Sequence, residues 1–141
     1  MTKKVLMSSQ VDLTVPFHDL DPLNIVWHGN YLKYFDIARF ALFAKAGVDL
    51  QQYFLDHKLL FPVSKTTTKH VLPLVHRDRF TCRADVREAR MKIVLDFEIR
   101  RLSDQALCCR GRGEQVAVKY PEQEILFEIP EEVSLALGHT P

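Results

Sequence analysis

The chain has 141 residues, of which 47% are hydrophobic and 26% charged, and its formal net charge is +1. This length suits one domain that buries a sizeable core without metals or disulfides. The near-neutral charge argues against duplex DNA as the main partner. The three cysteines are Cys82, Cys108 and Cys109, and their spacing fits neither a disulfide framework nor a zinc site.

The N-terminus carries two lysines with no apolar run after them, so we expect no secretory signal. No apolar run approaches the roughly 20 residues that a membrane span needs. Reduced thiols fit a reducing compartment. We therefore expect a cytoplasmic protein with a single domain over residues 1–141.

The first half of the chain predicts a strand followed by a long helix. Apolar and polar residues alternate from Val11 to Phe17, which indicates a strand with one buried face. Residues 30–46 have a helical pattern, with Asn30 as the expected N-cap and Gly47 just past the end. Apolar side chains cover most of this helix, so we expect it to be buried nearly all round. Residues 49–57 predict a short second helix.

The second half predicts mainly strands. Period-2 alternation marks residues 80–86 and 93–99, joined by a hairpin at 88–91. Gly111 and Gly113 indicate a bulge or a close backbone approach. The other expected elements are extended segments at 62–74 and 107–120, turns at 103–105 and 121–123, a last strand at 125–129, and a short helix opened by Pro130.

This order of elements predicts an α+β domain. Hairpins make neighbouring strands antiparallel. A single curved antiparallel sheet of five or six strands, wrapped around one long buried helix, would cover both the helix and the inner sheet face. That arrangement is the hot-dog fold.

The loop HDLDPLNIVWHGN, residues 18–30, carries two acids, two histidines and the only tryptophan of the chain. Residues 17–39 resemble the hot-dog acyl-CoA thioesterases, and most of all the 4-hydroxybenzoyl-CoA thioesterase and YbgC-like group. The shared pattern is an acid, any residue, a second acid, a small-residue loop, two apolar residues, an aromatic residue and a second ring-bearing residue. An Asn-Tyr pair then opens the helix.

The resemblance implies acyl-thioester hydrolysis, with Asp21 as the catalytic carboxylate. Asp21 would either attack the thioester carbonyl to give a mixed anhydride or activate a water, and both roles stay open. His28 matches the position whose backbone N–H polarises the substrate carbonyl, and its imidazole is a second candidate group. Unpaired N–H groups and the positive dipole end at a helix start stabilise an oxyanion. For Asp19, a turn or helix-approach role is favoured.

The next expectation concerns the residues that line the acyl pocket. The chain departs from the family pattern at Leu23 and Asn24, where relatives have small residues. Asn24 is a candidate to hold a water or the carbonyl, and Trp27 and Tyr31 are candidates to contact the acyl group. Aryl, polyenyl and medium-chain acyl groups all remain open.

The resemblance also implies the ligand and the assembly. The expected substrate carries coenzyme A or a phosphopantetheine arm on a carrier protein, with Arg90 and Lys92 contacting phosphates. We expect no metal and no other cofactor, and at least a homodimer, with a homotetramer favoured. Four other histidines are interpreted as surface or structural, and their scatter does not resemble metal-ligand spacing: His18, His57, His70 and His76. The alternatives are a non-catalytic acyl-thioester binding module and a hot-dog enoyl-CoA hydratase or dehydratase.

Overall fold

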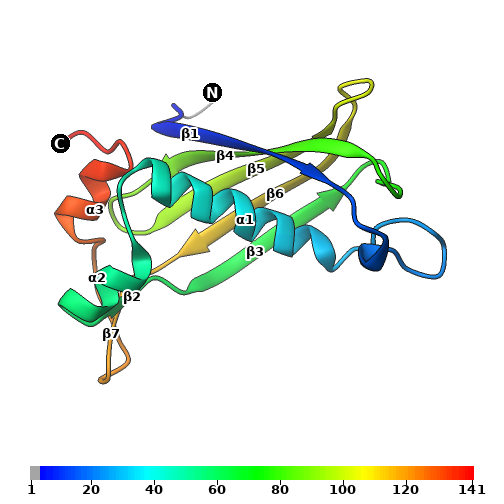
Figure 1. Ribbon diagram of the computed structural model, residues 1–141. Helices are drawn as coiled ribbons and strands as arrows, with labels where there is room; N and C mark the ends of the chain where they lie inside the picture. The colour runs from blue at the N-terminus through cyan, green and yellow to red at the C-terminus, as the bar shows by residue number, and fades with distance from the viewer. Residues whose placement is uncertain (1–3) are drawn as a thin grey trace.

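The computed structural model describes residues 4–141, and its main feature is an antiparallel five-stranded sheet that curves along one long helix (Figure 1). This is the predicted helix-and-sheet arrangement. A small second sheet of two-residue strands lies beside it, in the order β2 (Leu59–Leu60), β7 (Val118–Lys119), β8 (Glu124–Ile125). The main sheet has the order β1 (Met7–Thr14), β4 (Arg79–Glu88), β5 (Ile93–Arg101), β6 (Leu107–Gln115), β3 (Val63–His70).

The helices are α1 (Asn30–Lys45), α2 (Leu50–His57) and α3 (Glu131–Ala136), preceded by a 3-10 turn at Phe17–Asp19. Gly47 ends α1 with a φ of +77°, which is a backbone conformation that glycine adopts without strain. Asp49 caps α2 by accepting a hydrogen bond from the Gln52 N–H at 3.0 Å. In residues 4–141, none of the helices has the length and apolar character required to cross a bilayer.

The core lies between α1 and the inner face of the sheet. Phe35 of α1 stacks on Phe97 of β5 with ring centroids 4.6 Å apart. Leu42, Phe43 and Phe80 are also fully buried there. Burial of each such side chain contributes about 1.5–3 kcal/mol, so this layer holds α1 in place on the sheet.

Two glycines of β6 let α1 approach closely, as predicted. A Cβ at Gly111 would lie 2.4 Å from the Phe35 ring, and a Cβ at Gly113 would lie 2.9 Å from Nη2 of Arg39. Arg39 is itself buried, lies 5.4 Å over the Phe97 ring and donates from Nη1 to Asp36. Its Nε has no acceptor in residues 4–141. Burial lowers the pKa of Arg39, although Asp36 opposes the shift.

Two expectations about α1 were wrong. Gly29, not Asn30, occupies the N-cap position, and no side chain caps it. The predicted burial on all sides fails because the sheet covers only one side of the helix (Figure 1). Leu32, Ile37 and Phe40 remain 46%, 40% and 58% exposed.

Three details elsewhere also differ. The strand expected over 107–120 ends at Gln115, and the chain then enters the small sheet. Only Glu124–Ile125 is a strand in the segment expected to form the last one, and Phe127 is 79% exposed. Phe17 is exposed in the 3-10 turn rather than buried in β1. These segments have apolar residues but no neighbouring strand to pair with in the main sheet.

Candidate active site

Asp19 is buried at the start of the loop that precedes α1. Its carboxylate accepts hydrogen bonds from Lys33 Nζ and Tyr34 Oη, both at 2.6 Å. Burial opposes ionisation, but these donors and the charge of Lys33 outweigh it and hold the pKa of Asp19 below its ordinary value. The Asp19 carbonyl oxygen accepts from the Trp27 N–H at 3.0 Å and from the Asn30 side-chain amide at 2.9 Å. Asp19 therefore ties both ends of the loop to α1.

Asp21 begins a tight turn at the tip of the same loop. Its N–H donates to the Ile25 carbonyl at 2.8 Å, and its own carbonyl accepts from the Asn24 N–H at 2.9 Å. Its carboxylate accepts from the Leu23 N–H at 2.8 Å. Asn24 has a φ of 62°, a left-handed conformation that Asn tolerates better than most residues. Asn24 stands where relatives have a small residue, and it still adopts the backbone conformation that this turn requires.

A pocket of about 260 Å³ lies beside this loop, at the N-terminus of α1. Most of its wall is apolar, and only three of its residues carry polar side-chain groups: His28, Tyr31 and His70. The lining residues are Ile25, Val26, His28, Tyr31, His70, Val71, Leu72 and Pro73. Ile25 joins this pocket directly to the Asp21 turn, because it accepts the Asp21 N–H.

The backbone N–H groups of His28 and Gly29 donate to no acceptor within residues 4–141. They lie at the start of α1, so the positive end of the helix dipole adds to their own partial positive charge. Such donors stabilise negative charge that develops on a carbonyl oxygen. This geometry agrees with the role predicted for the backbone of His28.

The two predicted aromatic residues lie differently. Tyr31 is buried in the pocket wall, its oxygen accepts from the Leu74 N–H at 3.4 Å, and burial raises the pKa of Tyr31 to about 12. The hydroxyl is therefore neutral and keeps a proton to donate. Trp27 is half exposed and does not line the pocket. Its ring covers Gly29 so closely that a Cβ there would lie 2.2 Å from it.

His70 lines the pocket and was not predicted to do so. It is the last residue of β3, with its ring centroid 5.0 Å from Tyr31 and 6.3 Å from His28. Its Nδ1 lies 3.9 Å from the Cys109 Sγ. The register of β3 on β6 brings it here. β3 shows no apolar alternation, so its sequence gives no sign of which side chains face inward.

Arg90 and Lys92 follow the end of β4, and the connection from β4 to β5 lies at the opposite end of the sheet from the start of α1 (Figure 1), where this pocket is found. They belong to the hairpin between β4 and β5, and α1, about 24 Å long, separates the two ends. Arg90 is 3.6 Å from Glu128, and Lys92 is 2.7 Å from Glu114. One chain therefore does not bring these two cations together with Asp21.

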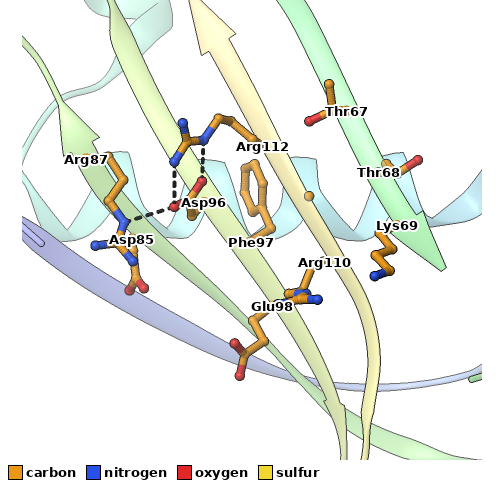
Figure 2. Close-up of a pocket in the computed structure, with 11 residues that line it drawn as sticks. Thr67, Thr68, Lys69, Asp85, Arg87, Asp96, Phe97, Glu98, Arg110 and Arg112 are labelled. Carbon is orange, nitrogen blue, oxygen red and sulfur yellow. Dashed lines mark hydrogen bonds and ion pairs between the residues drawn. The ribbon is translucent and has the colours of Figure 1, made fainter. Parts of the chain in front are cut away.

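A second hollow, of about 520 Å³, lies on the outer face of the sheet (Figure 2), and none of its lining residues belongs to the loop before α1. Asp96 connects the neighbouring strands at this hollow. Arg112 Nε and Nη2 donate to its two oxygens at 2.7 and 3.1 Å, and Arg87 Nε donates at 2.9 Å. Burial opposes ionisation of Asp96, but both guanidinium groups outweigh it and lower its pKa. This cross-strand network is part of a solvated sheet face. Within residues 4–141, no group of three or more His, Cys, Asp or Glu side chains is arranged to hold a metal ion.

Comparison with known proteins agrees with this geometry. Residues 15–137 match the family model of the Thioesterase-like superfamily, and the chain belongs to that family. A 1,4-dihydroxy-2-naphthoyl-CoA hydrolase of Thermosynechococcus vestitus is 32% identical over 72 residues. That match spans 51% of this chain and 49% of the relative, or about half of each.

Solved structures confirm the hot-dog thioesterase fold. A 1,4-dihydroxy-2-naphthoyl-CoA thioesterase from Synechocystis superposes with a TM-score of 0.86 at 17% identity, over 93% of this chain and 96% of that one. The 4-hydroxybenzoyl-CoA thioesterase from Pseudomonas sp. strain CBS-3 gives a TM-score of 0.83 at 22% identity, over 92% and 98%. The resemblance stated from residues 17–39 is therefore confirmed at the level of family and fold.

Proposed function

We propose that this protein hydrolyses acyl-CoA thioesters, with an aromatic acyl group as the preferred class. The observation that carries the proposal is the pair of unpartnered N–H groups of His28 and Gly29 beside a small, mostly apolar pocket. Two aromatic side chains, Tyr31 and His70, line this pocket with their rings at a steep angle to one another, which suits an aromatic guest. The named relatives act on naphthoyl-CoA and hydroxybenzoyl-CoA esters, which supports the same choice.

The proposed chemistry uses Asp21 and the start of α1. As a general base, Asp21 takes a proton from water while the water oxygen attacks the carbonyl carbon, and the carbonyl oxygen becomes an oxyanion held by the His28 N–H. Collapse expels the coenzyme A thiolate, which takes up the proton. As a nucleophile, Asp21 would first form a mixed anhydride that water then cleaves. Both routes give the free acid and the thiol.

A two-subunit site follows from the open edge of β3. β3 ends the sheet order, and all eight of its residues are exposed. The Thr67 carbonyl oxygen lies 3.2 Å from where a Cβ of Gly111 would be, so Thr67 points its backbone groups at β6. Those of Thr66 and Thr68 therefore face the free edge. An unpaired edge of this length is a template for a second strand, so we propose that two copies pair here.

Such pairing would complete the site. The strand registers place Val63, at the start of β3, level with Ile93 beside the β4–β5 hairpin, whereas His70 at its end lies at the pocket. A two-fold antiparallel pairing sets the partner's hairpin next to this chain's pocket. The partner's Arg90 and the partner's Lys92 would then lie near the bound thioester, where their charges suit coenzyme A phosphates. The buried thiols fit the cytoplasm as the compartment.

The first test is thiol release from short, medium, long and aryl acyl-CoA esters by the purified protein. We expect turnover, fastest with aryl esters, and a loss of about 10²-fold or more in Asp21→Asn. Asp12→Asn, which removes an exposed acid from β1, is the matched control and should keep full activity. Tight binding of these esters without any thiol release would instead indicate a binding module.

The second test separates the dimer from the chemistry. Thr68→Pro removes an N–H that faces the free edge, where proline is tolerated. We expect a folded monomer without activity. Thr67→Pro, one residue away, breaks the ladder to β6 and should lower the melting temperature instead. A Thr68→Pro protein that keeps the wild-type mass in solution would contradict pairing through β3.

A further inference from the structure

Two polar side chains of the pocket at the start of α1 have hydrogen-bonding atoms that the proposed function does not use. The pocket is mostly apolar, and Tyr31 and His70 serve in that proposal only as aromatic walls. An unpaired polar atom in an apolar pocket is unfavourable, and it favours a ligand that supplies the missing partner. The hydrogen-bonding state of these two side chains therefore indicates what the acyl group carries.

Tyr31 offers a hydrogen-bond donor to the pocket. Its oxygen accepts from the Leu74 N–H at 3.4 Å, and burial raises the pKa of Tyr31 to about 12, so the hydroxyl keeps its proton. Among residues 4–141, that proton is donated to no acceptor. Tyr31 is 3% exposed, so a ligand in the pocket can supply the acceptor that bulk water does not.

His70 offers a hydrogen-bond acceptor, and the thiol of Cys109 decides this. The Sγ of Cys109 lies 3.9 Å from Nδ1 of His70 and 3.7 Å from the Arg110 carbonyl oxygen. Burial raises the pKa of Cys109 to about 12, so the thiol keeps its single proton, and the Arg110 carbonyl, which can only accept, receives it. The sulfur then accepts from the Nδ1–H of His70. In the neutral imidazole this tautomer leaves Nε2 as an acceptor, and Nε2 has no partner in the described part of the chain, residues 4–141.

The fold holds the His70 ring next to the Tyr31 hydroxyl. His70 ends β3 opposite Cys109, and the next two N–H groups, of Val71 and Leu72, both donate to the Cys108 carbonyl at 2.9 and 3.2 Å. The ring of His70 meets that of Tyr31 edge-on, with centroids 5.0 Å apart and planes at 64°. A donor and an acceptor therefore stand side by side in a fixed arrangement. One chemical group satisfies both, a hydroxyl, because its oxygen accepts while its proton is donated.

We propose that His70 is a specificity-determining residue that selects acyl groups whose ring carries a hydroxyl. The ring hydroxyl donates to Nε2 of His70 and accepts from the hydroxyl of Tyr31, while the thioester carbonyl oxygen lies at the His28 N–H. A ring without the hydroxyl leaves both protein atoms unpaired, and a methoxy group, which has no proton to give, leaves Nε2 unpaired. This inference rests on the proposed function and deepens it, since it assigns one residue to the choice of substrate.

The test compares aryl esters that differ at one substituent. Thiol release is measured for benzoyl-CoA, the hydroxybenzoyl-CoA isomers and the matching methoxybenzoyl-CoA esters, at about pH 8, well above the ordinary pKa of imidazole. We expect kcat/KM of the wild type to be about 10–100-fold higher for at least one hydroxybenzoyl ester than for benzoyl-CoA, and no such gain for the methoxy esters. Equal rates for all of these esters would overturn the inference and leave the proposed hydrolysis intact. Absence of turnover on every ester would contradict the proposed function itself.

Two variants assign the preference to His70. His70→Phe keeps a ring but no nitrogen, and its loss of kcat/KM on the preferred hydroxybenzoyl ester should exceed its loss on benzoyl-CoA by about 10-fold or more. His70→Gln keeps an acceptor and should retain part of the preference. Circular dichroism checks that both variants are folded.

His76→Phe is the matched control, because His76 contacts Phe17 and does not line the pocket. It should keep the preference of the wild type. A His70→Phe protein with an undiminished preference would overturn the inference. So would one that loses the same factor on every ester, since His70 would then act on the shared reaction or on the fold rather than on the ring hydroxyl.

Discussion

Two acidic side chains stand two residues apart in the loop before α1, and the fold treats them in opposite ways. Asp19 is 2% exposed and serves as the acceptor for a lysine, a tyrosine and, through its carbonyl, two further groups. Asp21 stands at the loop tip, half-buried, and among residues 4–141 its carboxylate accepts a hydrogen bond only from the Leu23 N–H. The first acid is fully used by the structure, whereas the second keeps acceptor capacity for a reaction. Both acids are aspartates in the same loop, so the difference in their burial and hydrogen bonding comes from the donors that surround the first acid, Lys33 and Tyr34.

The largest expected effect is a loss of catalytic activity on substitution of the second acid, Asp21. Asp21→Asn should lower kcat/KM by about 10²–10⁴-fold, or roughly 3–5.5 kcal/mol of activation free energy. The Asn side-chain oxygen still accepts from the Leu23 N–H, so the free energy of unfolding should change by less than about 0.5 kcal/mol. Steady-state kinetics and urea unfolding of the same sample give both values. A large loss of stability would mean that Asp21 is structural as well.

The second effect is on stability. Asp19→Asn should lower the free energy of unfolding by about 2–4 kcal/mol, because it removes the charge that pairs with Lys33 and replaces one of the two acceptor oxygens by an NH2 group, which leaves either Lys33 or Tyr34 without an acceptor. Urea unfolding measures the loss. Tyr34→Phe, which removes one donor and keeps the ring, is the control and should cost about 1 kcal/mol. If Asp19→Asn were as stable as the wild type, the anchoring role of Asp19 would be wrong.

The turn at Asp21 offers a smaller effect. Asn24→Ala should destabilise the protein by about 1 kcal/mol, because alanine at a φ of 62° is strained. Asn24→Gly relieves that strain and should be close to neutral. Thermal unfolding compares the two. A kcat/KM that drops equally in both variants would indicate that the Asn24 side chain contacts the substrate.

The smallest effect is the part of the pH dependence of stability that Asp19 contributes. Its pKa in the folded protein lies below the ordinary 3.8, so its contribution is present above that value and is lost as the pH falls through the folded pKa. The stability difference between wild type and Asp19→Asn should therefore shrink as acid is added. Urea midpoints from pH 6 to pH 3 check this. If the stability difference stayed constant with pH, the stabilisation would come from the shape of the Asp19 side chain rather than from its charge.

Much of the fold was predictable because its signals are local. The period-2 segments in β4 and β5, the helix that Gly47 ends, and the close approach at Gly111 and Gly113 all depend on side-chain spacing and backbone freedom. The exposure of Phe40 was not predictable in this way. Hydrophobicity indicates that a residue favours burial, but not whether the fold of its own chain covers it.

The candidate site was predictable only along the loop. Residues 17–39 pointed to Asp21 and His28, but the contrast between Asp19 and Asp21 needs the positions of Lys33 and Tyr34 around the first acid. His70 joins the pocket through the pairing of β3 with β6, a contact between segments 39 residues apart. Arg90 and Lys92 lie in the β4–β5 hairpin, far from the pocket of the same chain, so their predicted role depends on the proposed pairing of two copies. The roles predicted for all these residues remain predictions.

The position of Trp27 has a practical consequence for optical measurements. It is the only tryptophan in the chain, half exposed, with its ring centroid 5.2 Å from that of His28. Its fluorescence therefore reports on one place, the start of α1 beside the pocket. A chromophoric aryl thioester that arrives there would quench the emission in proportion to occupancy, so the unlabelled protein contains its own probe for following the reaction in a stopped-flow instrument.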